Sequence, residues 1–245
     1  MSPLFIGTSG WAYDSWSGPF FPEDLPKKDR LHFYGTHFRA TELNGVFYRT
    51  PELKTVRSWA QATPRGFRFA WKASRFITHW NRLGPKSRRG LSLTQARLKA
   101  LGPKAGPVLF QLPPNFEADA ERLDGFLKLV KCHLPRRRCV FEFRHPSWYG
   151  DDIISILRRH HVALCISDHH DAPAPWIVTA RLVYVRGHGP GGRYRDRYPE
   201  KTLRNWARHI RQWRRERRTV HVYFDNDQKS AAPLDAMRLK EMLER

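Results

Sequence analysis

Ionisable and amide side chains stand at the ends of short apolar runs along much of this chain. Glu42 and Asn44 close one run, and Glu142 and Arg144 close another. The two residues of each pair are two positions apart, so on an extended strand both side chains point to the same face. A carboxylate on such a face can exchange protons with a substrate, and a guanidinium group can hold its anionic oxygens. These residue types predict acid–base chemistry on an anionic ligand.

The same pattern recurs at further runs, so the candidate site has many members. We predict that the general acids or bases are Glu42, Glu142 and Asp168. The predicted ligand-binding residues are Ser9, Asn44, Lys72, Gln111, Arg144, Arg186, His188 and Asn226. Whether the site is catalytic at all is left open by the sequence.

The apolar runs have the length of β-strands, and amphipathic segments with helical periodicity lie between most of them. We predict eight strands, at Leu4–Thr8, Ala40–Asn44, Phe67–Ala73, Val108–Leu112, Cys139–Arg144, Ala163–Asp168, Leu182–Arg186 and Thr219–Asp225. The predicted helices are Asp29–Phe38, Glu52–Ala62, Leu91–Leu101, Asp119–Val130, Asp151–His161, Glu200–Glu216 and Pro233–Leu243. The proline-containing segment between the sixth and seventh strands is predicted to hold a very short helix or none.

This alternation predicts an α/β fold of the (β/α)8 TIM-barrel type, since eight parallel strands that close into a barrel leave no exposed edge. A length of 245 residues suits a single domain spanning residues 1–245. Active sites of such barrels lie at the carboxyl ends of the strands. The predicted fold therefore brings the candidate residues to one rim.

The formal net charge of +21 indicates an anionic partner. Two basic segments with interleaved aromatic residues, 74–89 and 193–198, are expected at the same rim, where Trp80, Tyr194 or Tyr198 could stack on a base. The glycine-rich segment 187–193 is a further predicted anion site. Arg136–Arg138 precede a strand and are expected at the opposite end of the barrel, so the charge is partly dispersed.

Cysteine usage and the N-terminal sequence indicate a cytoplasmic protein without a membrane partner. The apolar stretch Leu4–Ile6 is too short for a signal peptide or a membrane span. Cys132, Cys139 and Cys165 lack the spacing of a metal site, and we expect them to be packing or chemically inert residues. The sequence does not reveal the oligomeric state.

Ordered motifs along nearly the whole chain resemble the domain-of-unknown-function family 72, also called the YecE-like family. The motifs are Gly7-Thr8-Ser9-Gly10-Trp11, Glu42-x-Asn44-x-x-Phe47-Tyr48-x-x-Pro51, Phe67-x-Phe69-x-x-Lys72, Ile77-Thr78-His79, Gln111-Leu112-Pro113-Pro114, Glu142-Phe143-Arg144-His145-x-Ser147-Trp148, Arg186-x-His188-Gly189 and Phe224-x-Asn226-Asp227. The resemblance implies a (β/α)8 barrel and brings no established reaction. Asp225 departs from the family pattern, which usually has Asn there, and adds a carboxylate to the rim.

Three functional hypotheses follow. The leading one is a barrel that binds a phosphate-bearing ligand, a nucleotide or nucleic acid, through Lys72, Arg144 and Arg186, with hydrolytic activity left open. The second is a metal-assisted isomerase or hydrolase of a small polar substrate, with Glu142, Asp168 and His188 as ligands. The third is a non-catalytic nucleic-acid-binding protein. No cofactor is predicted, and a metal ion remains an open alternative.

Overall fold

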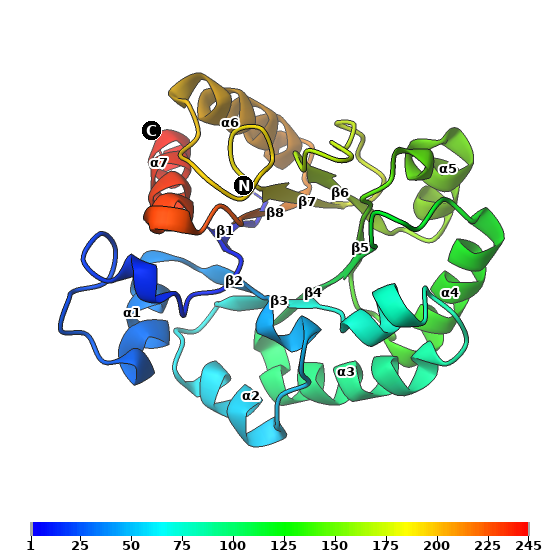
Figure 1. The fold of residues 1–245 in the computed structure, drawn as a ribbon, viewed down its shortest axis with the longest axis horizontal. Coiled ribbons are helices and arrows are strands. Elements are labelled where there is room, and N and C mark those ends of the chain that lie inside the picture. Colours follow the sequence, from blue (N-terminus) through cyan, green and yellow to red (C-terminus); the bar gives the residue numbers. More distant parts are fainter. Residues whose placement is uncertain (1, 245) are drawn as a thin grey trace.

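Eight parallel strands form the barrel in the computed structural model, which describes residues 2–244 (Figure 1). Around the barrel they follow the order β1-β8-β7-β6-β5-β4-β3-β2. The strands are β1 (Leu4–Thr8), β2 (Ala40–Leu43), β3 (Arg68–Lys72), β4 (Ala105–Gln111), β5 (Cys139–Glu142), β6 (Ala163–Ser167), β7 (Leu182–Gly187) and β8 (Thr219–Phe224). The predicted (β/α)8 TIM-barrel fold is confirmed.

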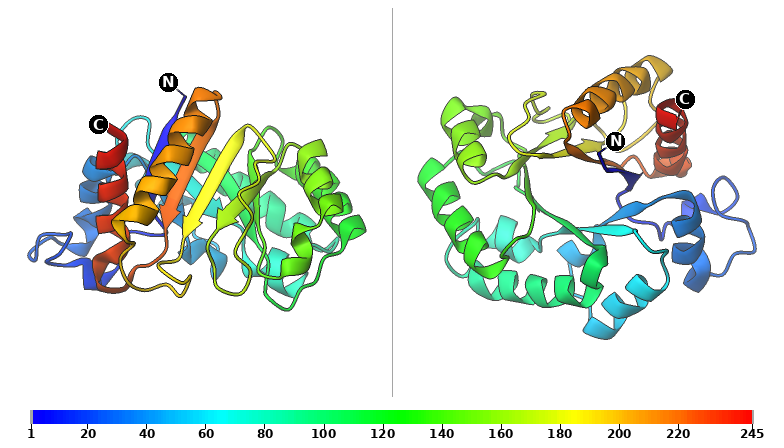
Figure 2. Two further views of the ribbon diagram at one scale, coloured as in Figure 1. Left: turned by 90° about the horizontal axis from the view of Figure 1, so that it is seen from above. Right: turned by 180° about the vertical axis from the view of Figure 1, so that it is seen from behind.

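Helices cover the outside of the strands (Figures 1 and 2). They are α1 (Arg30–His37), α2 (Leu53–Gln61), α3 (Ser87–Leu101), α4 (Ala120–His133), α5 (Asp151–Arg159), α6 (Glu200–Arg215) and α7 (Ala231–Glu244). The described chain between β6 and β7 contains no helix, as predicted. The helix α3 begins four residues before the predicted Leu91, because the basic residues of its first turn carry no apolar periodicity. Within residues 2–244, no helix combines the length and apolar character of a membrane span.

Two layers of apolar side chains make up the core. The inner layer fills the barrel and contains small residues and two buried tyrosines, Tyr184 and Tyr223. The outer layer lies between the strands and the helices. Cys139 and Cys165 are buried, whereas Cys132 is exposed on α4 and is therefore not a packing residue.

The seam between β1 and β2 is closed mainly by side chains. An isolated bridge between Ser9 and Glu42 is the backbone pairing described there. The hydroxyl of Tyr34, on α1, accepts a hydrogen bond from the Thr8 amide at 2.9 Å and donates one to the Ala40 carbonyl at 2.9 Å. The Tyr34 hydroxyl thus bridges the backbones of β1 and β2 where a direct hydrogen bond between the strands would otherwise pair them.

Candidate functional site

Arg186, at the end of β7, lies at the centre of the barrel mouth, the end formed by the carboxyl ends of the strands. Its guanidinium is 2.8 Å from Glu42 Oε1, on β2, and 2.7 Å from Glu142 Oε2, on β5. The carboxylate of Asp225, just after β8, is also 2.7 Å away. Arg186 is fully buried. One guanidinium therefore links the ends of four strands, and its terminal nitrogens are occupied by protein carboxylates.

The two glutamates of this cluster are saturated with hydrogen bonds. Glu42 accepts hydrogen bonds from Ser9 at 2.8 Å and from Tyr184 at 2.5 Å, in addition to that from Arg186. The second oxygen of Glu142 lies 2.6 Å from Arg144. Burial by itself raises the pKa of Glu142, but the adjacent guanidinium groups outweigh it and hold the pKa below its usual value. Glu142 is therefore ionised and does not supply a proton at neutral pH.

His188 is a neutral imidazole. Its Nε2 lies 3.1 Å from Arg144 and 3.2 Å from Arg186, and because guanidinium groups only donate, Nε2 must accept. Its Nδ1 then carries the proton and faces Asp168 Oδ1 at 3.3 Å. Burial and the neighbouring Arg186 lower the pKa of His188 well below its usual value.

These contacts argue against the predicted metal-ligand set of Glu142, Asp168 and His188. The lone pair of His188 Nε2 already faces two arginines, and both oxygens of Glu142 are paired with arginines. Among residues 2–244, the side chains with metal-site geometry are instead His169, His170 and Asp171, of which the last two are exposed. The residues of the mouth do not fit a resident metal ion.

Lys72, at the end of β3, is a cation of the mouth that forms no ion pair with a carboxylate among residues 2–244. Its Nζ lies 4.7 Å from the centre of the Phe47 ring, a cation–π contact. Burial, followed by the repulsion of Arg186, lowers the pKa of Lys72 to about 8. Lys72 is thus mostly charged at neutral pH and available to a ligand.

Other predicted site residues have structural contacts. Ser9 donates to Glu42, and Asn44 donates to Asp225 at 3.2 Å. Gln111 donates to the carbonyl of its neighbour Leu112. The structure places Asn226 elsewhere than predicted: it is fully buried and donates to the Asp196 carbonyl and to Asp235 rather than facing the mouth.

Asp168 and Asp227 are two carboxyl groups of the mouth whose pKa values are raised toward neutrality. Burial raises the pKa of Asp168 to about 6, even though its oxygens accept hydrogen bonds from the His188 amide and from Tyr198. Burial and the nearby charge of Asp225 raise the pKa of Asp227 to about 7. Asp225 was expected as an added carboxylate of the rim but not as a catalytic or binding residue, and Asp227 was not predicted for either role, although three successive polar residues after the eighth strand were the signal for it.

Three amides of the loop after β7, which was predicted to bind an anion through its backbone, already donate within the protein. The amide of His188 donates to Asp168, that of Gly189 to the Tyr198 hydroxyl, and that of Gly192 to the Gly189 carbonyl. Tyr198 is only 3% exposed, so it cannot stack on a base. Tyr194 accepts a hydrogen bond from Arg144 at 2.9 Å and packs edge-on against His188.

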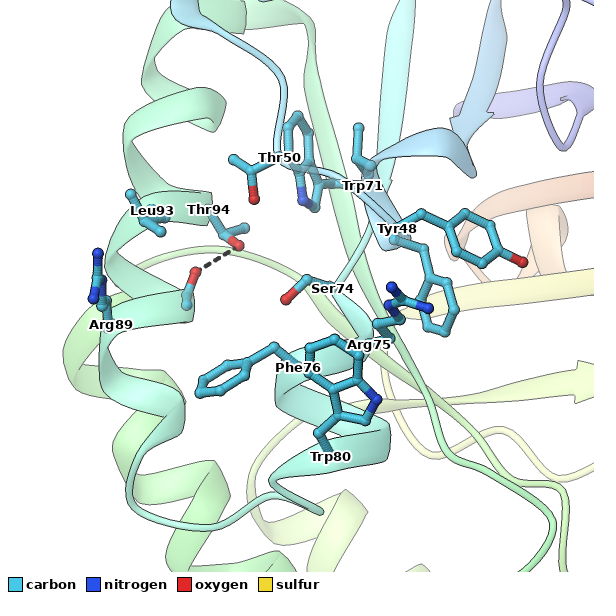
Figure 3. Close-up of a pocket in the computed structure, with 13 residues that line it drawn as sticks. Tyr48, Thr50, Trp71, Ser74, Arg75, Phe76, Trp80, Arg89, Leu93 and Thr94 are labelled. Atoms are coloured by element: carbon cyan, nitrogen blue, oxygen red, sulfur yellow. Dashed lines mark hydrogen bonds between the residues drawn. The ribbon is translucent and has the colours of Figure 1, made fainter.

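A pocket of about 340 Å³ adjoins the mouth between the loops after β2 and β3 and the helix α3 (Figure 3). Its rim holds Tyr48, Arg75 and Trp80, which we call the aromatic platform. The Arg75 guanidinium lies 5.7 Å from the ring centre of Tyr48 and 4.6 Å from that of Trp80. Tyr48 is 68% exposed and Trp80 is 66% exposed. Trp80 ends a single π-helical turn, Phe76–Trp80, a form often found at functional sites.

The aromatic platform is connected to the centre of the mouth through one ring. Phe47 contacts Tyr48 edge-on at 5.0 Å between ring centres, and its other neighbours are His79 at 4.9 Å and the Lys72 ammonium. Burial and the charge of Lys72 lower the pKa of His79 to about 4, so it is neutral. A single aromatic side chain, Phe47, therefore separates the aromatic platform from Lys72.

Comparisons with known proteins show relatives over the full length of the chain. The family described as "Protein of unknown function DUF72" matches residues 5–245. The UPF0759 protein YunF of Bacillus subtilis (strain 168) is 25% identical, with 98% of this chain and 95% of YunF covered. A DUF72 family protein from Thermotoga maritima MSB8 has a crystal structure that is 25% identical, with a TM-score of 0.89, 99% of this chain and 100% of that chain covered.

More distant structures share the fold alone. The crystal structure of 3-keto-D-glucoside 4-epimerase, YcjR, from E. coli is 13% identical, with a TM-score of 0.59 and coverage of 100% of this chain and 99% of that chain. The family motifs and the full-length match agree with the barrel described above. This chain belongs to the DUF72 family, a family of proteins of unknown function.

Proposed function

We propose that the barrel mouth binds a phosphate-bearing ligand with a planar ring, either a nucleotide or a nucleotide unit of a nucleic-acid strand. The observation that carries this proposal is the position of Arg75 against two exposed rings, Tyr48 and Trp80. Exposed aromatic rings accept a base by stacking, and a guanidinium beside them can hold a phosphate. The aromatic platform therefore suits both parts of a nucleotide.

The charge arrangement at the mouth supports the same ligand. Arg186 is committed to three carboxylates, so it is a structural cation rather than the anion ligand that the sequence suggested. Arg75 and Arg89, which line the pocket, and Lys72 are cations near the platform that could hold a phosphate. The ring of Phe47 separates Lys72 from Tyr48, so a ligand whose base lies on the platform would direct its phosphate toward the mouth.

Acid–base chemistry on the bound ligand, including hydrolysis, is the second candidate function. Asp227 supports it, because a carboxyl group with a pKa of about 7 exists in both protonation states at neutral pH. Asp168, with a pKa of about 6, is a further general base, whereas Glu142 is held ionised by two arginines. In this proposal the acid–base role moves from Glu42 and Glu142 to the two aspartates.

Binding is tested by titrating the protein with adenosine monophosphate, adenosine and inorganic phosphate in separate experiments. Replacing Trp80 by Ala should weaken binding of the nucleotide about tenfold, because a stacked base is lost. Trp176→Ala is the matched control, since Trp176 is also exposed, at 42%, but packs against Trp213 of α6. Equal losses in the two variants would overturn the proposal, and so would adenosine that binds as tightly as its monophosphate.

Catalysis is tested by measuring phosphate release from nucleoside phosphates between pH 5 and 9, with Asp227→Asn as the variant. The proposal expects activity that rises with pH through about 7 and is lost in Asp227→Asn while nucleotide binding remains. Absence of turnover over the whole range would refute the catalytic candidate and leave the binding proposal to its own test.

A further inference from the structure

A second pocket, of about 270 Å³, lies at the opposite end of the barrel, where the strands begin. Its walls include Arg68, at the start of β3, and the consecutive Arg136, Arg137 and Arg138, just before β5. We call this the arginine pocket. We propose that it binds an oligophosphate group, a site independent of the mouth.

Among residues 2–244, the lining of the arginine pocket contains four arginines and no carboxylate. An arginine cluster without neighbouring acidic groups repels itself, and a multiply charged anion relieves that repulsion. The planar, forked guanidinium matches phosphate oxygens in pairs of hydrogen bonds. Four arginines that line one small volume match a chain of linked phosphates better than a singly charged anion.

The pocket is pre-arranged by aromatic contacts. The rings of Phe5 and His221 stack at 4.6 Å between centres, and the Arg68 guanidinium lies 5.6 Å from the centre of Phe5. His221 is only 3% exposed, and its Nδ1 is 2.9 Å from the Tyr223 hydroxyl. Packing against these rings limits the freedom of Arg68, which reduces the entropy lost when a ligand binds.

The positive charge of the pocket comes from arginine alone. Burial, together with Arg138 and Arg68, lowers the pKa of His221 to about 3, so its ring is neutral at physiological pH. Arginine side chains keep their charge at every pH at which the protein is folded. The pocket is therefore a permanent cationic site, unlike the mouth, where Lys72 titrates.

Isothermal titration of the intact protein with inorganic tripolyphosphate tests the site. The double substitution Arg68→Gln/Arg138→Gln should weaken tripolyphosphate binding at least about tenfold, because charge-assisted hydrogen bonds are lost. The control is Arg208→Gln/Arg215→Gln, which removes the same charge from the exposed face of α6. Equal losses in the two double variants, or no binding to the unaltered protein, would overturn the proposal.

Two further titrations ask whether paired guanidinium contacts hold the ligand and whether the ligand is a nucleotide or an inorganic oligophosphate. Arg138→Lys keeps the charge, so an affinity between those of the unaltered and double-substituted proteins supports paired guanidinium contacts, and unchanged affinity argues against them. ATP is titrated in a Trp80→Ala background, which weakens the mouth. If Arg68→Gln/Arg138→Gln also weakens ATP, the site takes the phosphate tail of a nucleotide. If it weakens tripolyphosphate alone, the site takes inorganic oligophosphate.

Discussion

At the mouth, Arg186 is fully buried and forms ion pairs with three carboxylates, whereas at the opposite end Arg138 is exposed in a pocket whose lining holds no carboxylate. Both residues contribute equally to the net charge of +21. Their surroundings give them opposite roles, because an arginine whose donors are used by the protein cannot also hold a ligand. Net charge thus indicates an anionic partner, and the pairing of each cation indicates where that partner can bind.

The largest difference between the two ends should appear in stability. Arg186→Met leaves three carboxylates of the mouth without their central cation and should reduce the free energy of unfolding by about 3–5 kcal/mol. Arg138→Met removes an unpaired cation and should change it by less than about 0.5 kcal/mol. Urea unfolding of the two variants at pH 7 measures both values. Similar losses would show that the mouth cluster is not the stabilising network described above.

Acid should lower the stability of the protein through His221, the buried imidazole that lines the arginine pocket. The usual pKa of histidine is 6.5 and the folded value for His221 is about 3, so the unfolded chain takes up a proton at a higher pH than the folded one. The stability contributed by the neutral ring is therefore present above pH 6.5 and is lost as the pH falls toward 3.

Replacement of His221 by Phe tests this expectation. The stability of the variant relative to the unaltered protein should improve by about 3 kcal/mol as the pH falls from 7.5 to 4.5. Urea unfolding at the two pH values measures the change. A difference between the two proteins that does not vary with pH would contradict the assignment of a neutral buried ring.

Ligand binding should depend on pH at one end only. Lys72 is charged below its pKa of about 8, so raising the pH from 7 to 9.5 should weaken adenosine monophosphate binding about tenfold. Tripolyphosphate binding at the arginine pocket should not weaken, since arginines keep their charge. Parallel titrations at the two pH values provide the measurement, with Lys72→Gln as the control that should remove most of the pH dependence and leave only the part due to Asp227. If the affinities for adenosine monophosphate and for tripolyphosphate both fell as the pH rises, the two ends of the barrel would not differ in the titration of their cations.

The smallest effect should separate two adjacent arginines. Arg89 lines the pocket beside the aromatic platform, whereas Arg88 faces a different pocket between α3 and α4. Arg89→Gln should weaken nucleotide binding about threefold, and Arg88→Gln should have little effect, because screening limits the reach of an exposed charge. Titrations at fixed ionic strength compare them. Equal losses would mean that general electrostatic attraction, and not the pocket, holds the ligand.

The fold was predictable because the spacing of apolar residues along the sequence distinguishes strands from helices. Strands buried on both faces read as apolar runs, and the amphipathic face of α6 repeats along its length. Strand ends also carry information: Glu42, Glu142 and Arg186 meet at the mouth because all three end parallel strands of one barrel.

Hydrogen-bond partners were not predictable from the sequence. Asn226 follows β8 as a site residue would, yet its side chain turns into the protein toward Asp235. Tyr198 lies in a basic, solvent-rich stretch, yet its hydroxyl is buried against Asp168. The loop after β7 has no periodicity, and its path depends on contacts between residues far apart in the chain. For the same reason the sequence suggested Arg186 as an anion ligand when its donors belong to carboxylates.

The hydroxyl of Tyr34 makes the barrel unequal around its circumference. β1 pairs with β8 through five residues, whereas on its other side the Tyr34 phenol bridges it to Ala40 of β2. The junction between β1 and β2 has fewer backbone hydrogen bonds than the junction between β1 and β8. In local fluctuations of the barrel, strands separate first where the backbone pairing is weakest. Local opening between β1 and β2 should therefore precede global unfolding, while the pairs that β1 forms with β8 are still intact.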